Sequence, residues 1–123
     1  AVDHIGELQA WDLATGERKW TAKFPQQLWG PVLSTAGGLV FAGGTNDRFF
    51  RAFDASSGEI LWQQRTNSGV TGVPTSFAVD GVQYIAVQSG WGVDAARGQA
   101  MLNTSMGTDI HVPQGGVLWV FAL

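Results

Sequence analysis

Short segments in which apolar and polar residues alternate recur along most of the chain, and glycine-rich or Asp-containing turns separate them. Alternation with a period of two is typical of strands that bury one face. Residues 92–115 contain several glycines and follow no clear period, so we expect a long loop there. The pattern predicts no helix, and it predicts strands at residues 6–11, 17–24, 29–35, 39–45, 48–53, 59–66, 73–79, 82–90 and 116–123.

One unit of this pattern occurs twice. Residues 8–20 read LQAWDLATGERKW, and residues 50–62, which begin 42 positions later, read FRAFDASSGEILW. Each copy predicts a hairpin between two strands. The Asp (Asp12 and Asp54) is expected to accept hydrogen bonds from turn N–H groups, and the Gly (Gly16 and Gly58) to supply the positive φ that closes the turn.

A tryptophan follows each turn at the same distance, at Trp20 and Trp62. A repeat in the low forties has the length of one four-stranded propeller blade. In such a radial array, these indoles would lie between neighbouring sheets. We therefore interpret the Asp, Gly and Trp residues of the repeat as residues that hold blades together rather than as residues that carry chemistry.

The strands group as two, four and three along the chain, which is too few to close a propeller of four to eight blades. We expect an all-β fold in which 1–123 is one part of a single larger propeller domain. Residues 1–28 would end one blade and 29–66 would form a full blade. Residues 67–123 would form a last blade that carries the long loop 92–115.

Composition narrows the possible partners. The net charge is −3 and the 7 Lys and Arg residues are scattered, so the sequence predicts no nucleic-acid partner. There is no cysteine, which excludes a disulfide framework and a thiolate metal site. No apolar run reaches the length of a membrane span. The first residues, AVDHIGEL, have no basic start followed by an apolar stretch, so we expect no signal peptide.

The pattern A-[aromatic]-D-x-x-[ST]-G-E-x-x-W resembles the tryptophan-docking repeat of quinoprotein alcohol dehydrogenases. The runs WGPVLSTAGGLVF, SGWG and QGGVLWVFAL are similar to the C-terminal quarter of the large subunit of these enzymes. The resemblance covers nearly the whole chain and is nearer to the ethanol-dehydrogenase branch than to the two-subunit methanol enzyme. It implies the last two to three blades of an eight-bladed propeller.

This resemblance also implies an activity. Enzymes of this family are periplasmic, oxidise alcohols to aldehydes with pyrroloquinoline quinone, and pass the electrons to a c-type cytochrome. A calcium or lanthanide ion polarises the quinone carbonyl. The catalytic Asp and the metal ligands would lie in the remainder of the propeller polypeptide, outside this chain, so the resemblance implies no catalytic or metal-binding residue here.

Four residues of this chain match places where the family meets the quinone. Leu28-Trp29-Gly30 matches the string whose Trp lies flat beneath the quinone ring, and Gly30 would let the backbone approach closely. Gly90-Trp91 matches a place near the quinone carboxylates, where an indole N–H can donate. The alternatives are that Trp29 is another interblade tryptophan and that Trp91 covers the end of a sheet.

The remaining polar residues are weaker candidates for a functional site. His4, Asp94, Asp109 and His111 have no partner at metal-ligand spacing, and we expect each to be a solvated loop residue. Asp94 and Arg97 are expected to pair weakly within the long loop.

Two other functions compete with that of an enzyme part. Outer-membrane assembly lipoproteins use similar repeats in a propeller that holds no cofactor and acts as a scaffold. A free-standing fragment with open strand edges would instead self-assemble.

Overall fold

The structure of the chain is a computed structural model that describes residues 3–123. Residues 1–2, which begin both the 1–28 range and the segment expected to lack a signal peptide, lie outside the described part. The described residues form elements in this order: β1 (Gly6–Trp11), β2 (Arg18–Phe24), β3 (Val32–Ser34), β4 (Leu39–Ala42), β5 (Phe49–Asp54), β6 (Ile60–Arg65), β7 (Thr75–Val79), β8 (Val82–Ser89), α1 (Gly92–Met106) and β9 (Val117–Ala122).

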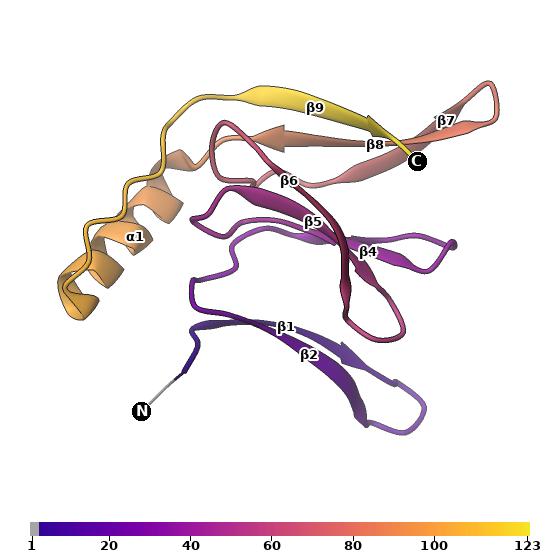
Figure 1. Cartoon of the computed structure of the whole chain (residues 1–123), viewed down its shortest axis with the longest axis horizontal. Helices are drawn as coiled ribbons and strands as arrows, with labels where there is room; N and C mark the ends of the chain where they lie inside the picture. The colour runs from indigo at the N-terminus through magenta and orange to yellow at the C-terminus, as the bar shows by residue number, and fades with distance from the viewer. Residues whose placement is uncertain (1–2) are drawn as a thin grey trace.

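The strands form three antiparallel sheets, and within each sheet neighbours in space are neighbours in sequence (Figure 1). The orders are β1-β2, β3-β4-β5-β6 and β7-β8-β9. This grouping of two, four and three strands confirms the sequence expectation, because alternation and turn chemistry are local signals that survive folding.

The prediction that no helix is present is wrong. Residues 92–106 form α1, inside the segment expected to be a loop. Alanine, glutamine, methionine and leucine favour a helix here, and Gly107 ends it in the left-handed conformation with φ 66°. A glycine in mid-helix and the lack of a side-chain cap at Trp91 hid this signal. Among the described residues, no helix is long and apolar enough to cross a membrane.

The repeated turns have the predicted chemistry. Asp12 Oδ1 accepts hydrogen bonds from the N–H groups two and three residues further on, at 2.9 and 3.3 Å. Asp54 Oδ1 does the same at 2.7 and 3.1 Å. Gly16 and Gly58 have φ values of 70° and 77°. Both hairpins are therefore closed by the same Asp-to-Gly device.

The first repeat contacts the turn of the second. Trp20 on β2 donates from Nε1 to the carbonyl of Ala55 at 2.8 Å. Its ring lies against Gly58, where an added Cβ would be 2.5 Å from Cε3 of the indole. Trp62, at the same place in the second repeat, instead lies edge-on to Phe121 of β9, with 4.9 Å between ring centroids.

Two apolar cores join the three sheets. One lies between the first and second sheets and contains Leu8, Phe24, Ala42 and Phe53. The other lies between the second and third sheets and contains Phe41, Phe50, Ala52, Val70, Ile85 and Val87. Each core therefore sits between neighbouring sheets, as in sheets that pack face to face.

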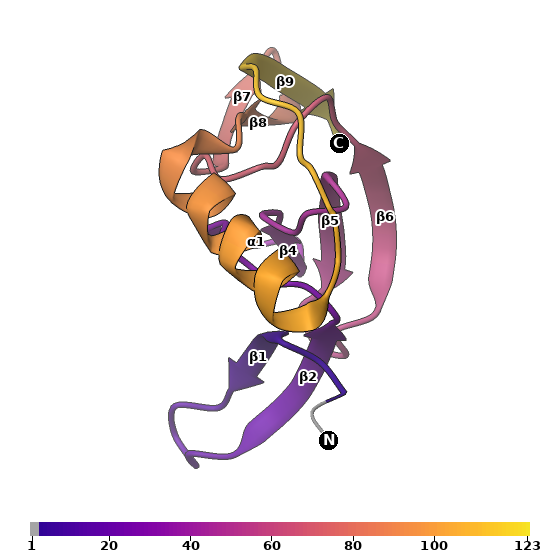
Figure 2. The same cartoon turned by 90° about the vertical axis from the view of Figure 1, so that its left-hand side faces the viewer.

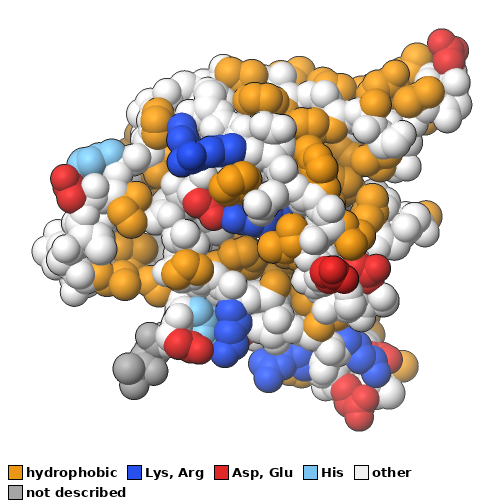
Figure 3. Space-filling model, in the orientation of Figure 1, with side chains coloured by type: hydrophobic (Ala, Val, Ile, Leu, Met, Phe, Trp, Pro, Cys, Tyr) orange, Lys and Arg blue, Asp and Glu red, His pale blue; other side chains and the backbone are white. Residues whose placement is uncertain are grey.

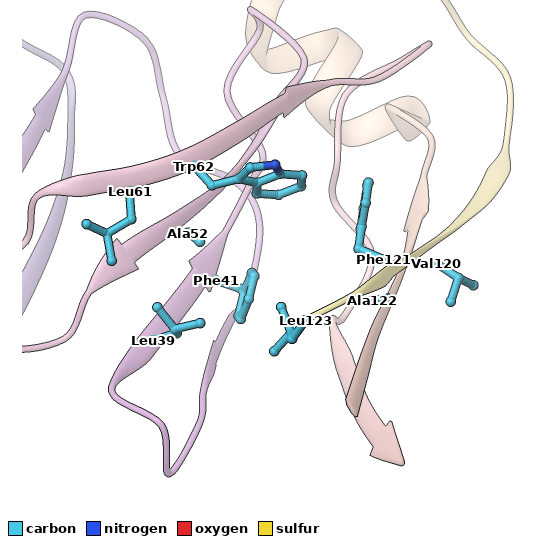
Figure 4. A pocket seen from close by; sticks show the side chains of 9 residues that line it. All are labelled: Leu39, Phe41, Ala52, Leu61, Trp62, Val120, Phe121, Ala122 and Leu123. Carbon is cyan, nitrogen blue, oxygen red and sulfur yellow. The ribbon is translucent and has the colours of Figure 1, made fainter. Parts of the chain in front are cut away.

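A wide apolar groove of about 460 Å³ remains between the second and third sheets. Trp62 projects into it from β6 and Phe121 from β9, with Phe41 and Leu39 along one wall (Figure 4). Further apolar side chains gather at the surface over the β7-β8-β9 sheet (Figure 3). The groove lies between strands rather than at the loops, so it belongs to the packing of the sheets.

Candidate functional site

Four connections leave the same end of the sheets. They are residues 25–31 between β2 and β3, 43–48 between β4 and β5, 66–74 between β6 and β7, and 90–116, which contains α1. Antiparallel strands alternate in direction, so every second connection of a sheet falls at one end. This is the left-hand end in Figure 1, and Figure 2 shows α1 running across it. All four residues singled out from the sequence lie in these connections.

Trp29 lies in the connection between β2 and β3. Its backbone N–H donates to the carbonyl of Gly44 at 3.0 Å, which fixes the start of the side chain against the β4–β5 loop. The side chain is 41% exposed. The edge of its ring lies against α1, where an added Cβ at Gly98 would be 2.5 Å from Cζ2. The indole is thus held on one side and open on another.

Gly30 is packed between backbone groups. An added Cβ would lie 2.6 Å from the carbonyl oxygen of Gly43 and 2.8 Å from that of Val70. Real Cβ atoms do not approach backbone oxygens so closely. Only glycine allows the three connections to meet here.

Gly90 and Trp91 link β8 to α1. Gly90 donates its backbone N–H to the carbonyl of Gly69 at 2.7 Å and has φ 155°. Trp91 is only 3% exposed, and its ring packs against Gly69, where an added Cβ would be 1.8 Å from Cε3. Nε1 of Trp91 is buried and has no hydrogen-bond partner among the described residues. A buried N–H of this kind is costly unless an acceptor reaches it.

The structure brings Trp29 and Trp91 together. Both line one hollow of about 260 Å³, together with Thr71 and the first residues of α1. Gly90 lines a neighbouring hollow that shares Thr71. The charged residue among those that line the first hollow is Asp94. Its walls therefore offer two aromatic surfaces, the hydroxyl of Thr71 and one carboxylate.

Thr71 and Gln99 were not anticipated from the sequence. Thr71 donates from Oγ1 to the carbonyl of Gly90 at 2.7 Å and so connects two loops of the site. Gln99 is 6% exposed, accepts from Asn46 at 2.9 Å and donates to Asn103 at 3.0 Å. No local pattern marks these residues, because their importance comes from loops that are distant in sequence.

A charge pair joins the β4–β5 connection to β5, with Arg51 buried and Asp47 partly buried. Arg51 forms an ion pair with Asp47 and donates to Thr45 Oγ1 at 3.0 Å. Burial by itself would raise the pKa of Asp47, but hydrogen bonds from Arg51 and Thr45 and from the Phe49 N–H outweigh it. The net result is an Asp47 pKa below its ordinary value.

The other polar candidates lie apart from this hollow, Asp94 excepted. Asp94 and Arg97 pair at 4.0 Å with both side chains exposed, as expected, but they lie in α1 and not in a loop. His111 contacts Asp109 at 2.8 Å, again at the surface. His4 differs from the expectation because it is partly buried and contacts the carboxylates of Asp3 and Glu7. The hydrogen bond with Asp3 is the larger cause, and that with Glu7 the smaller, of a raised pKa of the His4 ring. No group of three His, Asp or Glu residues within 3–123 could hold a metal ion.

Three sheets of sequential antiparallel strands, with loops gathered at one end, define a piece of a β-propeller, and comparison with known proteins identifies its kind. Residues 22–85 match the family described as "Glucose/ethanol/alcohol dehydrogenase, beta-propeller domain". The chain belongs to this family of pyrroloquinoline-quinone propeller domains.

Its relatives are quinoprotein dehydrogenases. The chain is 42% identical, over 98% of its length, to the quinoprotein alcohol dehydrogenase PedH of Pseudomonas putida. It is 40% identical, over 71% of its length, to subunit 1 of the methanol dehydrogenase [cytochrome c] of Paracoccus denitrificans. It covers 20% of the first protein and 14% of the second. The chain thus spans about a fifth or less of these curated relatives.

Solved structures agree. A europium-containing methanol dehydrogenase superposes with a TM-score of 0.84 at 33% identity, over 99% of this chain and 24% of that chain. BamB from Moraxella catarrhalis superposes with a TM-score of 0.51 at 22% identity, over 69% of this chain and 30% of that chain. The second likeness extends to the fold alone.

Proposed function

We propose that this chain is the C-terminal part of a periplasmic enzyme that oxidises alcohols to aldehydes with pyrroloquinoline quinone and passes electrons to a c-type cytochrome. The observation that carries the proposal is the meeting of Trp29 and Trp91 at one hollow, in a chain of this family. The names of the relatives support the remainder, since one is a methanol dehydrogenase with cytochrome c as its partner.

In this proposal, Trp29 forms the floor of the quinone site and Trp91 its rim. A planar tricyclic quinone needs a flat apolar surface, and an indole is the largest that a protein offers. The buried Nε1 of Trp91 has no acceptor within residues 3–123, and a quinone carboxylate is a suitable one. Gly90 lines the neighbouring hollow and lets the backbone come close to the ligand. Gly30 lines neither hollow and would support the site by letting the connections around it pack together. The aromatic residues therefore fit this cofactor, and the one carboxylate of the lining, Asp94, is solvent-exposed.

The quinone, when bound, supplies the acceptor for the hydride equivalent of the alcohol. This chain contributes binding and orientation. No Lys or Arg is among the residues that line the hollow, so the charges that balance the carboxylates would come from other parts of the polypeptide. The same holds for the catalytic Asp and for the ligands of a calcium or lanthanide ion. The similarity to a europium-containing methanol dehydrogenase supports a lanthanide ion.

The blades are proposed to run over 1–28, 29–66 and 67–123, as the last two to three of an eight-bladed ring. Trp20 would then be a docking tryptophan between two blades. Its hydrogen bond to Ala55 and its contact with Gly58 support this role, since both partners belong to the next repeat.

Replacing Trp29 tests the quinone site. In the complete polypeptide, Trp29→Ala removes the proposed aromatic floor, and we expect the dissociation constant for the quinone to rise about tenfold. Equilibrium dialysis with absorbance detection measures this constant. Trp29→Phe keeps an aromatic face and is the matched control, with most of the affinity retained. Unchanged affinity in Trp29→Ala contradicts the assignment.

The cofactor-free scaffold is the second candidate, and the likeness to BamB favours it only at the level of fold. The absorbance spectrum of the purified complete polypeptide separates the two. Quinone bands that disappear on denaturation and filtration are expected for the enzyme. A protein that carries no quinone and cannot be loaded with it would leave the scaffold as the better reading.

A further inference from the structure

Gly98 lies in the middle of α1, where the helix meets the ring of Trp29. An added Cβ at Gly98 would be 2.5 Å from Cζ2 and 3.2 Å from Cη2 of the indole, and 3.3 Å from Oε1 of Gln27. The first distance is shorter than any real contact of a Cβ atom. The helix therefore has room for the indole only because residue 98 carries no side chain.

Glycine is unfavourable at this position for the helix itself. It is the poorest helix former after proline, and the neighbours Ala95, Ala96 and Ala100 are among the best. Helix stability alone would therefore favour alanine at residue 98. The fit against Trp29 offers a physical reason for glycine at this point of the helix.

The helix is anchored more firmly than the indole. Gln99 accepts a hydrogen bond from Asn46 in the β4–β5 connection, at 2.9 Å, and is 6% exposed. Asn103 donates to the carbonyl of Ile110 at 2.9 Å, which ties the helix to the segment that follows it. The Trp29 side chain is 41% exposed. A side chain at residue 98 would therefore displace the indole rather than the helix.

We propose that Gly98 is a positioning residue, through which α1 sets the orientation of the Trp29 indole at the hollow shared with Trp91. The consequence for quinone binding rests on the function proposed above. The contact itself does not, because it is made between residues of this chain. The first residues of α1 line the hollow, but Gly98 does not, so Gly98 acts on the cofactor site only through the indole of Trp29.

The test uses the complete polypeptide, labelled with 5-fluorotryptophan and free of quinone. The ¹⁹F resonance of Trp29 is assigned by its loss in Trp29→Phe. In Gly98→Ala we expect this resonance to shift or broaden, while that of Trp20, assigned through Trp20→Phe, stays in place. Gly37→Ala is the matched control, since its nearest atom is a hydroxyl 3.9 Å from an added Cβ. It is expected to leave the Trp29 resonance unchanged.

Quinone affinity gives the second readout. Gly98→Ala is expected to raise the dissociation constant of pyrroloquinoline quinone, added with calcium or a lanthanide, about two- to tenfold. In the Trp29→Phe background, whose shorter ring lacks the clashing atoms, Gly98→Ala is expected to add nothing. Such rescue marks a contact with the indole and not a general loss of folding.

The outcomes separate the two proposals. An unmoved Trp29 resonance in Gly98→Ala overturns the positioning role, as does an affinity loss of equal size in the Trp29→Phe background. A moved resonance with unchanged affinity overturns the link to the cofactor. A polypeptide that never binds quinone refutes the proposed function, and the ¹⁹F spectrum of Gly98→Ala then still decides whether Gly98 positions Trp29.

Discussion

Arg51 shows how a charged side chain is kept inside an apolar interface. Its guanidinium carbon lies 5.5 Å from the centre of the Phe24 ring and 5.1 Å from that of Phe49. Asp47 and Thr45 accept hydrogen bonds from the same group. Burial of a charge is tolerated when it is paired and hydrogen-bonded in this way. The pair joins β5 to the loop that adjoins the candidate site.

The pH dependence of this pair is a prediction at the residue scale. The folded pKa of Asp47 lies below its ordinary value. Its contribution to stability is therefore complete above the unfolded pKa near 4 and is lost as the pH falls through the lower folded pKa. Asp47→Asn should lower the free energy of unfolding by about 2 kcal/mol at pH 7. This is less than the loss expected for a fully buried ion pair, because Asp47 is partly exposed.

Denaturant unfolding of the complete polypeptide at pH 7 and pH 3 measures this effect. The difference in free energy of unfolding between the original protein and Asp47→Asn should be smaller at pH 3 than at pH 7. Asp109→Asn is the control, because Asp109 pairs with His111 at the surface and should contribute little. A gap that stays constant from pH 7 to pH 3 would contradict the assigned pKa direction.

At the scale of elements, the repeat works through its turn. In the turn of the second repeat, Asp54 closes the hairpin and Gly58 leaves a surface without a side chain. Trp20 lies on the surface formed by Gly58 and donates to Ala55. The same turn therefore closes its own hairpin and packs against the tryptophan of the preceding repeat.

Gly58→Ala tests this double role. An alanine with positive φ costs about 1 kcal/mol, and the clash with Trp20 should add about 1–3 kcal/mol. Gly81→Ala is the matched control, since Gly81 has φ 78° and no atom within 4 Å of an added Cβ. The free energy of unfolding from denaturant titration gives both values. Equal costs at the two positions would mean that Trp20 adds nothing to this turn.

At the scale of the molecule, three sheets stand side by side with apolar surface left open on them. Leu61 and Trp62 of β6 line the groove between the second and third sheets. Leu118 of β9 is also exposed. The chain spans about a fifth of the length of the curated relatives. In the proposed complete propeller, further blades would cover such surfaces, as closure of the ring requires.

Gly16 offers a test of that continuation. It occupies in the first repeat the place of Gly58 in the second, and an added Cβ meets nothing within 4 Å. If another repeat precedes it, a tryptophan should lie on Gly16 in the complete polypeptide. Gly16→Ala should then destabilise as much as Gly58→Ala. A cost no greater than that of Gly81→Ala would argue against a preceding blade at this turn.

The sequence by itself determined the strands, their grouping and the two Asp–Gly turns. These features depend on neighbours within a few residues, so period and turn chemistry report them directly. It also singled out Trp29 and Trp91, through the resemblance of short runs around them.

Only the tertiary structure decided the rest. It showed that residues 92–106 are helical, although the segment has Gly98 at its centre and no side-chain cap at its start. It brought Trp29 and Trp91 to one hollow, with Trp29 against Gly98 of α1 and Trp91 against Gly69 of the β6–β7 connection. It also buried Gln99 and Arg51 with partners that a linear pattern does not mark, because such contacts join separate elements across space.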